Sequence, residues 1–138
     1  MKLMDYLNDT DRFANGSGAR LTEVREGYAR AELTVEERHL NAVGVCQGGA
    51  LFTLADLAFA AVANSRGVAT VGVNNSATFL RSARLGDRLI AECSEVMDHH
   101  KLPFCEVKVS NDRGELLAVI TGLAYRISNK EFKFDSLM

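Results

Sequence analysis

Apolar and polar residues alternate along several stretches of this chain, and the alternation predicts β-strands. In residues 28–35 every second position is apolar, which is typical of a strand with one buried face. Residues 21–25 supply an antiparallel partner across the tight turn Glu26-Gly27. The turn NDRG at residues 111–114 predicts a second hairpin. The remaining strands are expected at about 68–80, 87–98, 103–111 and 115–127.

One segment has a different pattern. Residues 49–64 are rich in Ala and Leu, contain no Pro and are apolar nearly all round, which predicts a helix buried on most faces that ends near Asn64. A shorter amphipathic helix is expected within residues 2–14, ended by NGSG at 15–18. A sheet buries a single apolar helix best by curling around it. The pattern therefore predicts the α+β class and the hotdog fold, an antiparallel β-sheet wrapped around one long central α-helix.

Length and composition narrow the class of protein. At 138 residues we expect a single domain, 1–138, with an N-terminal helix and loop at 1–18 and a C-terminal tail at 128–138. The net charge of −2 provides no electrostatic footprint for nucleic acid. The first residues lack the apolar core of a signal peptide, so a cytoplasmic protein is expected. The three cysteines show no CxxC spacing and are expected as free thiols.

Asp56 is the unusual residue of the apolar helix. Leaving His39 aside, it is the only formally charged residue between Arg38 and Arg66. A charge at the centre argues against a membrane span, as does the short length of the segment. Burial would raise the pKa of Asp56, and acids in such positions are often functional. The alternative is a structural role: a backbone cap, or an ion pair with an arginine. The candidates are Arg66, Arg81 and Arg84.

The helix is preceded by the turn Gln47-Gly48-Gly49, which could hold an oxyanion. Glycines allow close approach of a ligand, and N–H groups at a helix start point outward with the positive end of the dipole. A tight loop-to-helix turn is the alternative reading. Gly48 and Asp56 are eight residues apart, or about 12 Å along one helix. Because both must lie about 3 Å from the reacting centre, their joint action requires Gly48 of one subunit and Asp56 of another, and hence at least a dimer.

Two strings carry a family resemblance: HLNAVGVCQGGALFTLADLAFAAVANSRG and the later FLRSARLGDRL. Together they resemble the PaaI branch of the hotdog-fold acyl-CoA thioesterases, in the 4-hydroxybenzoyl-CoA thioesterase-like superfamily. The resemblance implies that Asp56 is the general base or nucleophile and that the Gly48 amide is the oxyanion donor. It further implies that Asn41 positions the water or the thioester. Two residues depart from the family pattern: Gln47 stands where His is usual, and Ser82 where Pro is usual.

Further residues are expected to contact the substrate. Phe52 and Phe59 lie one helical turn either side of Asp56, where they would contact the acyl or aryl group. Asn74 interrupts an apolar strand together with Asn75, either to face the ligand or as a bulge or interface hydrogen bond. The complete set of predicted substrate-binding residues is Gln47, Gly49, Phe52, Phe59, Asn74, Arg81 and Arg84, with the two arginines near the CoA phosphates by resemblance.

These features predict an acyl-CoA thioesterase that hydrolyses acyl- or aryl-CoA to free acid and CoA. Coenzyme A is part of the substrate, and no metal, other cofactor, nucleic acid or membrane is expected as a partner. The assembly is expected to be a homodimer or a dimer of dimers. His39, His99 and His100 form no metal-ligand spacing, and Cys46 has no His at a relay position. A non-catalytic acyl-CoA-binding protein remains the alternative. A hotdog hydratase is disfavoured because the helix and its preceding turn contain no His.

Overall fold

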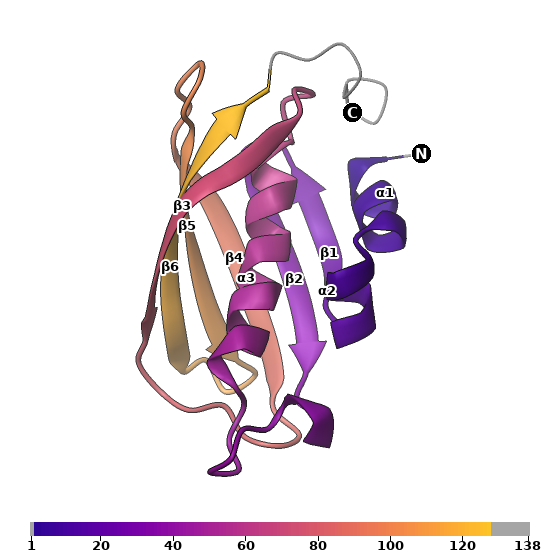
Figure 1. Cartoon of the computed structure of the whole chain (residues 1–138), viewed down its shortest axis with the longest axis vertical. Helices are drawn as coiled ribbons and strands as arrows, with labels where there is room; N and C mark the ends of the chain where they lie inside the picture. The colour runs from indigo at the N-terminus through magenta and orange to yellow at the C-terminus, as the bar shows by residue number, and fades with distance from the viewer. Residues whose placement is uncertain (1, 128–138) are drawn as a thin grey trace.

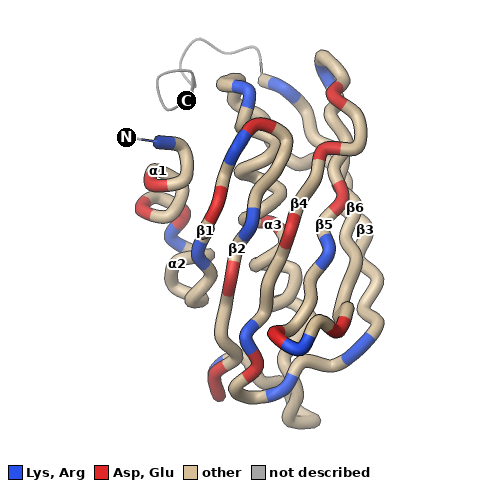
Figure 2. The backbone as a smooth tube through the Cα atoms, turned by 180° about the vertical axis from the view of Figure 1, so that it is seen from behind, with Lys and Arg blue, Asp and Glu red and all other residues tan. Residues whose placement is uncertain are grey.

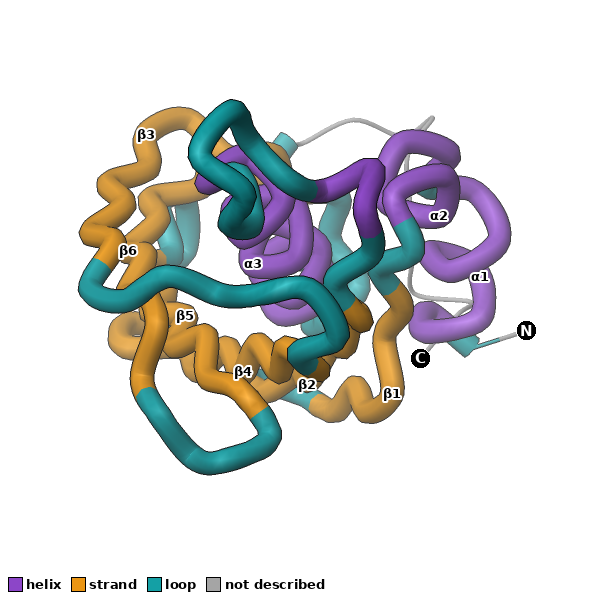
Figure 3. Tube along the Cα trace, turned by 90° about the horizontal axis from the view of Figure 1, so that it is seen from below, coloured by secondary structure: helices purple, strands orange, loops and turns teal. Residues whose placement is uncertain are grey.

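The computed structural model describes residues 2–127. Six strands form one antiparallel sheet in the order β1-β2-β4-β5-β6-β3, and the sheet curves around the long helix α3 (Figures 1 and 3). Each strand lies within two residues of its predicted position, so these predictions are confirmed. The strands are β1 Arg20–Arg25, β2 Tyr28–Thr34, β3 Thr70–Phe79, β4 Arg88–Met97, β5 Phe104–Asn111 and β6 Leu116–Arg126.

Helix α3, Gly48–Ala63, is the predicted central helix. Its inner side packs on the sheet and supplies much of the core, with Leu54 and Ala58 fully buried. The expectation of burial nearly all round is wrong for the single chain. Gly49 and Asp56 are exposed and Thr53 between them is half-buried, a spacing that puts all three on one helix face. The sheet encloses only part of the helix, so this face is left open.

The N-terminal segment forms two short helices, α1 Leu3–Thr10 and α2 Arg12–Ser17, where one helix within 2–14 followed by a break was expected. Asp11 separates the helices, and its side chain accepts a hydrogen bond from the Ala14 amide as the N-cap of α2. Gly18 ends α2 with a φ of 90°, a left-handed conformation that favours glycine. The chain therefore breaks at Asp11, which was not predicted, and at Gly18, the last residue of the predicted NGSG.

Strand β3 lies at one edge of the sheet and is open to solvent. Val71 to Phe79 are all exposed, and Val73 and Phe79 each keep about half of their surface. Figure 2 shows charged residues along β1, β2, β4 and β5, whereas β3 has none. A β-bulge interrupts its pairing with β6 between Gly72 and Asn74, directly before the two asparagines for which a bulge was one of the alternatives. A long, uncharged edge with exposed apolar side chains is a surface that proteins normally cover.

Three further observations complete the fold. Within residues 2–127 no helix is long and apolar enough to cross a membrane. All three cysteines are free and buried, as expected. The predicted C-terminal tail, 128–138, lies outside the described residues.

Candidate active site

The start of α3 presents one unpaired backbone N–H. Gln47 is the N-cap: its side-chain Oε1 accepts from the Gly49 amide at 2.7 Å, and its backbone oxygen accepts from the Ala50 amide at 2.9 Å. The Gly48 amide precedes these two amides and has no hydrogen-bond partner among residues 2–127. Unpaired N–H groups at a helix start carry the positive end of the dipole. The Gly48 amide is therefore available to a ligand oxygen.

Steric contacts explain both glycines of this turn. A Cβ on Gly49 would lie 2.5 Å from Gln47 Oε1, so a side chain there would displace the cap. A Cβ on Gly48 would lie 3.2 Å from Cζ of Phe79, whose ring packs against this residue. The Gln47 side chain orients the turn by capping it, which gives a structural reason for its presence next to the amide donor.

The loop before α3 is held from two sides. The Cys46 amide donates to the Ala83 oxygen and the Gln47 amide donates to the His39 oxygen, both at 2.8 Å. The His39 ring is itself occupied, with Nδ1 accepting from the Glu36 amide at 2.9 Å. Burial raises the pKa of Cys46, which disfavours a reactive thiolate. His39 and Cys46 thus position the loop, and the structure gives neither a place in a nucleophilic relay.

Asn41 shapes the same loop and keeps a donor free. Its Oδ1 accepts from the amides of Val43 at 3.1 Å and Val45 at 3.2 Å. Its Nδ2 donates no hydrogen bond within residues 2–127. The exposed amide group is therefore fixed in orientation by its oxygen while its nitrogen can donate to a ligand.

Gly48 and Asn41 line one hollow of about 370 Å³, which we name the Gly48 hollow. Its lining residues are Asn41, Val45, Cys46, Gly48, Leu51, Phe79, Leu80, Arg81 and Ser82. The structure thus brings together three residues predicted from the sequence, Asn41, Gly48 and Arg81, around the unpaired amide.

Asp56 lies in a separate hollow of about 280 Å³, the Asp56 hollow. It is lined by Asp11, Phe13, Ala14, Phe52, Thr53 and Asp56. The expectation that Asp56 is buried is wrong for the single chain, in which the residue is exposed. Enough protein surrounds the carboxyl group for desolvation to raise the pKa of Asp56, and the nearby Asp11 charge raises it further.

Asp56 has no compensating cation in the described chain. Arg66 pairs with Glu26, Glu95 and Asp98, and Arg81 pairs with Glu115. Between residues 2 and 127 no ion pair reaches Asp56, and its carboxylate caps no backbone group. The structural alternatives for this acid therefore find no support, and a carboxylate with a raised pKa faces an open hollow.

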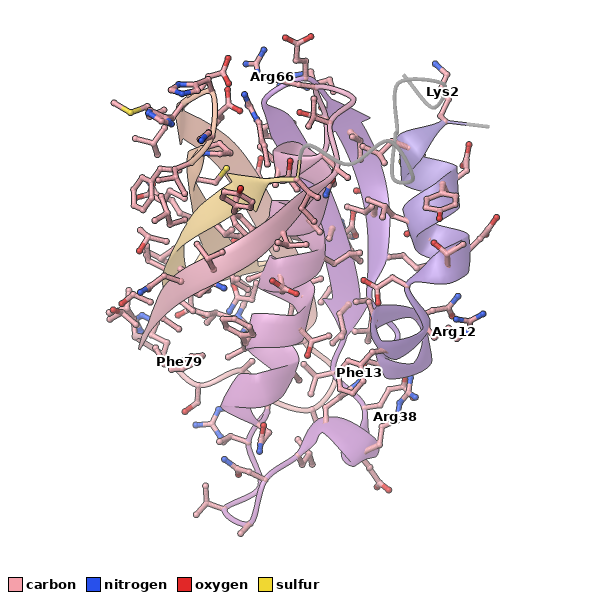
Figure 4. All side chains as sticks on the ribbon, turned by 45° about the horizontal axis from the view of Figure 1, so that its top comes forward. Lys2, Arg12, Phe13, Arg38, Arg66 and Phe79 are labelled. Carbon is pink, nitrogen blue, oxygen red and sulfur yellow. The ribbon has the colours of Figure 1, made fainter. Side chains whose placement is uncertain are left out.

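The two hollows lie apart in the single chain and share no residue. Figure 4 shows Phe13, which lines the Asp56 hollow, and Phe79, which lines the Gly48 hollow, on opposite sides of α3. This matches the spacing along the helix, which separates Gly48 from Asp56 by about 12 Å. Neither hollow of one chain holds both the amide and the acid.

Five of the seven predicted substrate-binding residues line neither hollow: Gln47, Gly49, Phe59, Asn74 and Arg84. Gln47 and Gly49 belong to the capped turn itself, and Arg84 lines a third hollow. Phe59 is 4% exposed and packs into the core, where a Cβ on Gly122 would lie 2.7 Å from its ring. Asn74 pairs with Leu123 and so faces the outer side of the sheet. Asn75 pairs with Gly122 and faces the helix side instead. The bulge decides which asparagine faces inward, so pattern alone could not have distinguished them.

A third hollow, of about 280 Å³, adjoins the Gly48 hollow and is rich in arginine. This arginine hollow is lined by Arg81, Ser82, Arg84, Arg113, Glu115 and Leu117. It shares Arg81 and Ser82 with the Gly48 hollow. Arg113, in the turn between β5 and β6, was missed because nothing in the local pattern of a turn distinguishes it.

Asp87 holds the arginine hollow together. Its buried carboxylate accepts from the Arg84 amide at 2.9 Å and pairs with Arg113 at 3.2 Å. The Arg84 amide and the Arg113 guanidinium lower the pKa of Asp87, so the carboxylate stays ionised. One buried acid therefore joins the loop before β4 to the β5–β6 turn. A larger hollow, of about 510 Å³ between α1 and β1, contains none of the predicted site residues.

The chain matches a known protein family over more than half of its length. Residues 43–118, more than half of the chain, match the family described as the Thioesterase superfamily. The chain is 38% identical over 131 residues to a putative esterase of Archaeoglobus fulgidus, covering 95% of this chain and 84% of the relative. The chain belongs to the thioesterase superfamily. The expected family resemblance is thereby confirmed.

Relatives with more specific names support the branch and the fold. Over 121 residues this thioesterase is 32% identical to the acyl-coenzyme A thioesterase PaaI of Escherichia coli, covering 88% of this chain and 86% of the relative. The solved structure of the E. coli PaaI protein, from the phenylacetic acid degradation operon, superposes with a TM-score of 0.88 at 30% identity and 91% coverage of each chain. A Streptococcus mutans protein, smu.793, bound to acetyl-CoA matches with a TM-score of 0.75 at 27% identity over 78% of this chain and 86% of that one. The hotdog fold is confirmed.

The family match does not extend over the whole site of this thioesterase. It covers the helix start, Asp56 and the shared Arg81, but helices α1 and α2 precede its first residue. Asp11 and Phe13 therefore belong to a part of the Asp56 hollow that the matched region leaves out. Sequence reasoning missed both residues.

Proposed function

We propose that this thioesterase hydrolyses acyl-CoA thioesters to the free acid and CoA. Two features of the chain carry the proposal. The Gly48 amide at the start of α3 has no hydrogen-bond partner within residues 2–127, and the Asp56 carboxylate has a raised pKa and no ion-pair partner there. An acyl transfer to water needs a base and an oxyanion donor. The E. coli relative is named an acyl-coenzyme A thioesterase, and the S. mutans structure contains acetyl-CoA, which supports the same substrate class.

Each group has a chemical role in the proposed reaction. The Asp56 carboxylate takes a proton from water, and the resulting hydroxide attacks the thioester carbonyl carbon. The Gly48 N–H donates to the carbonyl oxygen as it becomes negative, and Asn41 Nδ2 is placed to orient the thioester or the water. The carbon–sulfur bond then breaks and the CoA thiolate leaves. In the alternative route Asp56 attacks directly, and water hydrolyses the acyl-carboxylate intermediate.

The site is proposed to form between two copies of this chain. The exposed, uncharged edge of β3 can pair with β3 of a second copy across a two-fold axis, which would continue the sheet and cover apolar residues such as Val73 and Phe79. Such pairing places the two α3 helices antiparallel on one side of the joined sheets. Gly48 of one subunit can then face Asp56 of the other. A dimer of dimers is compatible with the same interface.

The arginine hollow is proposed to bind the CoA phosphates. Arg81 and Arg84 were expected there, and Arg113 adds a third guanidinium held by Asp87. Guanidinium groups bind phosphate oxygens through charge-assisted hydrogen bonds. Because this hollow and the Gly48 hollow share Arg81, the arm of CoA can run from the phosphates to the oxyanion donor.

The first test follows thiol release from a panel of acyl- and aryl-CoA esters by wild type and by Asp56→Asn. We expect turnover by wild type and a large loss in the variant, which has lost the base. Equal turnover by both proteins would refute the role of Asp56. Binding of CoA esters without hydrolysis would indicate a non-catalytic acyl-CoA-binding protein instead.

The two-subunit site has its own test, in which Asp56→Asn and Gly48→Pro are co-expressed. Each variant alone lacks one half of every site. With random pairing, half of the dimers contain one copy of each variant, and one of their two sites has both native groups. About a quarter of wild-type activity should therefore return. If both groups acted within one chain, mixing would restore nothing.

A further inference from the structure

The N-terminal helices α1 and α2 contribute two side chains to the Asp56 hollow that have no role in the chemistry above. Phe13 is 75% exposed, more than Phe79 at 51% or Tyr125 at 42%, and it lines the hollow together with Phe52. Asp11 lies at the same rim, and its charge acts on Asp56. Figure 4 shows Phe13 on α2, beside α3.

Several hydrogen bonds fix this segment to the rest of the chain. The buried Asn8 side chain bonds both the amide and the oxygen of Leu21, at 2.8 and 3.0 Å, and so attaches α1 to β1. Asp11 caps α2 through the Ala14 amide at 3.1 Å. The Ser17 oxygen lies 2.7 Å from Nε2 of His39, which joins the end of α2 to the loop before α3. Phe13 therefore belongs to a helix whose two ends are held by hydrogen bonds.

The direction of the substrate follows from the other hollows. The thioester carbonyl carbon bears a sulfur on one side and the acyl group on the other. The Gly48 and arginine hollows share Arg81 and Ser82, so the sulfur and the CoA arm occupy that side. The acyl group is left with the hollow around Asp56 of the facing subunit.

We infer that Phe13 and Asp11 form one wall of the acyl subsite, which selects neutral, apolar acyl groups and rejects those that carry a carboxylate. The inference rests on the proposed function and deepens it. Phe13 and Phe52 both line the hollow and supply apolar surface, and Asp11 and Asp56 give it negative charge. A volume of about 280 Å³ lies just below the usual range of ligand pockets, which begins at about 300 Å³, so the subsite suits short acyl groups.

The test compares three esters: acetyl-CoA, pentanoyl-CoA and glutaryl-CoA. The last two have acyl chains of equal length and differ in charge. Phe13→Ala should lower the ratio of kcat/KM for pentanoyl-CoA to that for acetyl-CoA by about threefold to tenfold, because the longer chain loses a wall. Asp11→Asn, which preserves the helix cap, should raise the ratio for glutaryl-CoA to pentanoyl-CoA by a similar factor of about three to ten. Phe104→Ala, a half-buried aromatic on the outer face of the sheet, is the matched control.

Two outcomes would overturn the inference. One is an unchanged pentanoyl-to-acetyl ratio in Phe13→Ala. The other is that Phe13→Ala changes the size of the assembly, measured by light scattering, and lowers kcat/KM equally for every ester. That result would make Phe13 a subunit contact. If wild type hydrolyses no ester, the proposed function fails, but the acyl subsite can still be tested by binding. Calorimetry then gives the Kd of each ester, and the ratios of these Kd values replace the ratios of kcat/KM. A change of the ratio in Phe13→Ala that is absent in Phe104→Ala supports the subsite.

Discussion

Gly48→Pro removes the backbone N–H that is proposed to be the oxyanion donor and breaks no hydrogen bond within residues 2–127, so it tests that donor directly. The Gly48 amide has no partner among residues 2–127, so the helix loses no hydrogen bond. Gly48 is the first residue of α3, where Pro is well tolerated, and its φ is not positive. The preceding Gln47 is extended, with φ −66° and ψ 138°, which is the conformation that a following Pro requires.

The expected loss can be worked from these contacts. Removing one oxyanion donor costs about 10²–10³-fold in kcat. The free energy of unfolding should change by less than about 1 kcal/mol, because no hydrogen bond is lost and the atoms nearest to the new Cβ all belong to the Phe79 ring. A new Cβ would lie 3.2 Å from that ring, so the ring must move by a few tenths of an ångström.

Gly48→Ala is the matched control, because it adds the same Cβ against Phe79 and keeps the N–H. The assay is thiol release from an acyl-CoA ester at saturating concentration, with thermal melts of both variants. We expect Ala to retain far more activity than Pro at similar melting temperatures. Equal kcat for the two folded variants would refute the donor role of the Gly48 amide.

Three other measurements test different parts of the structure. In the proposed reaction Asp56 must be ionised to activate water, and desolvation and the Asp11 charge raise the pKa of Asp56. The value of kcat/KM should therefore fall on acidification with a midpoint above the usual aspartate pKa of about 3.9. Asp11→Asn should lower that midpoint. Arg113→Gln should raise KM for an acyl-CoA by about threefold to tenfold and leave KM for the same acyl N-acetylcysteamine thioester, which lacks phosphates, unchanged. Gly122→Ala should lower the free energy of unfolding by about 1–3 kcal/mol in denaturant titrations, because its Cβ would lie 2.6 Å from a neighbouring side chain. Gly16→Ala, with nothing within 4 Å, should not destabilise, and equal melting of these two variants would contradict the packing described.

Much of the fold was predictable because local patterns reported it. Alternation located the six strands to within two residues, and continuous apolar character located α3 to within one. The turn before β6 was also predicted, since Gly114 has the positive φ that glycine favours. These features depend on spacing along the chain, which a sequence displays directly. The resemblance then led from the QGG turn and Asp56 to the thioesterase family.

Other properties depended on which residues the fold brings together. Apolar neighbours made Asp56 look buried, but the sheet covers only one side of α3 and leaves that acid exposed. Phe59 is close to Asp56 in sequence and turns into the core, whereas Phe13, far away in sequence, reaches the Asp56 hollow.

The sequence by itself determined the six strands, the central helix and the family, and it predicted two half-sites at Gly48 and Asp56. Only the tertiary structure decided what surrounds them. It added Arg113 to the arginine hollow through the buried Asp87, and Phe13 to the Asp56 hollow through helix α2. The physical reason is that periodicity encodes which face of an element is apolar, while contacts between distant segments depend on how all the elements pack.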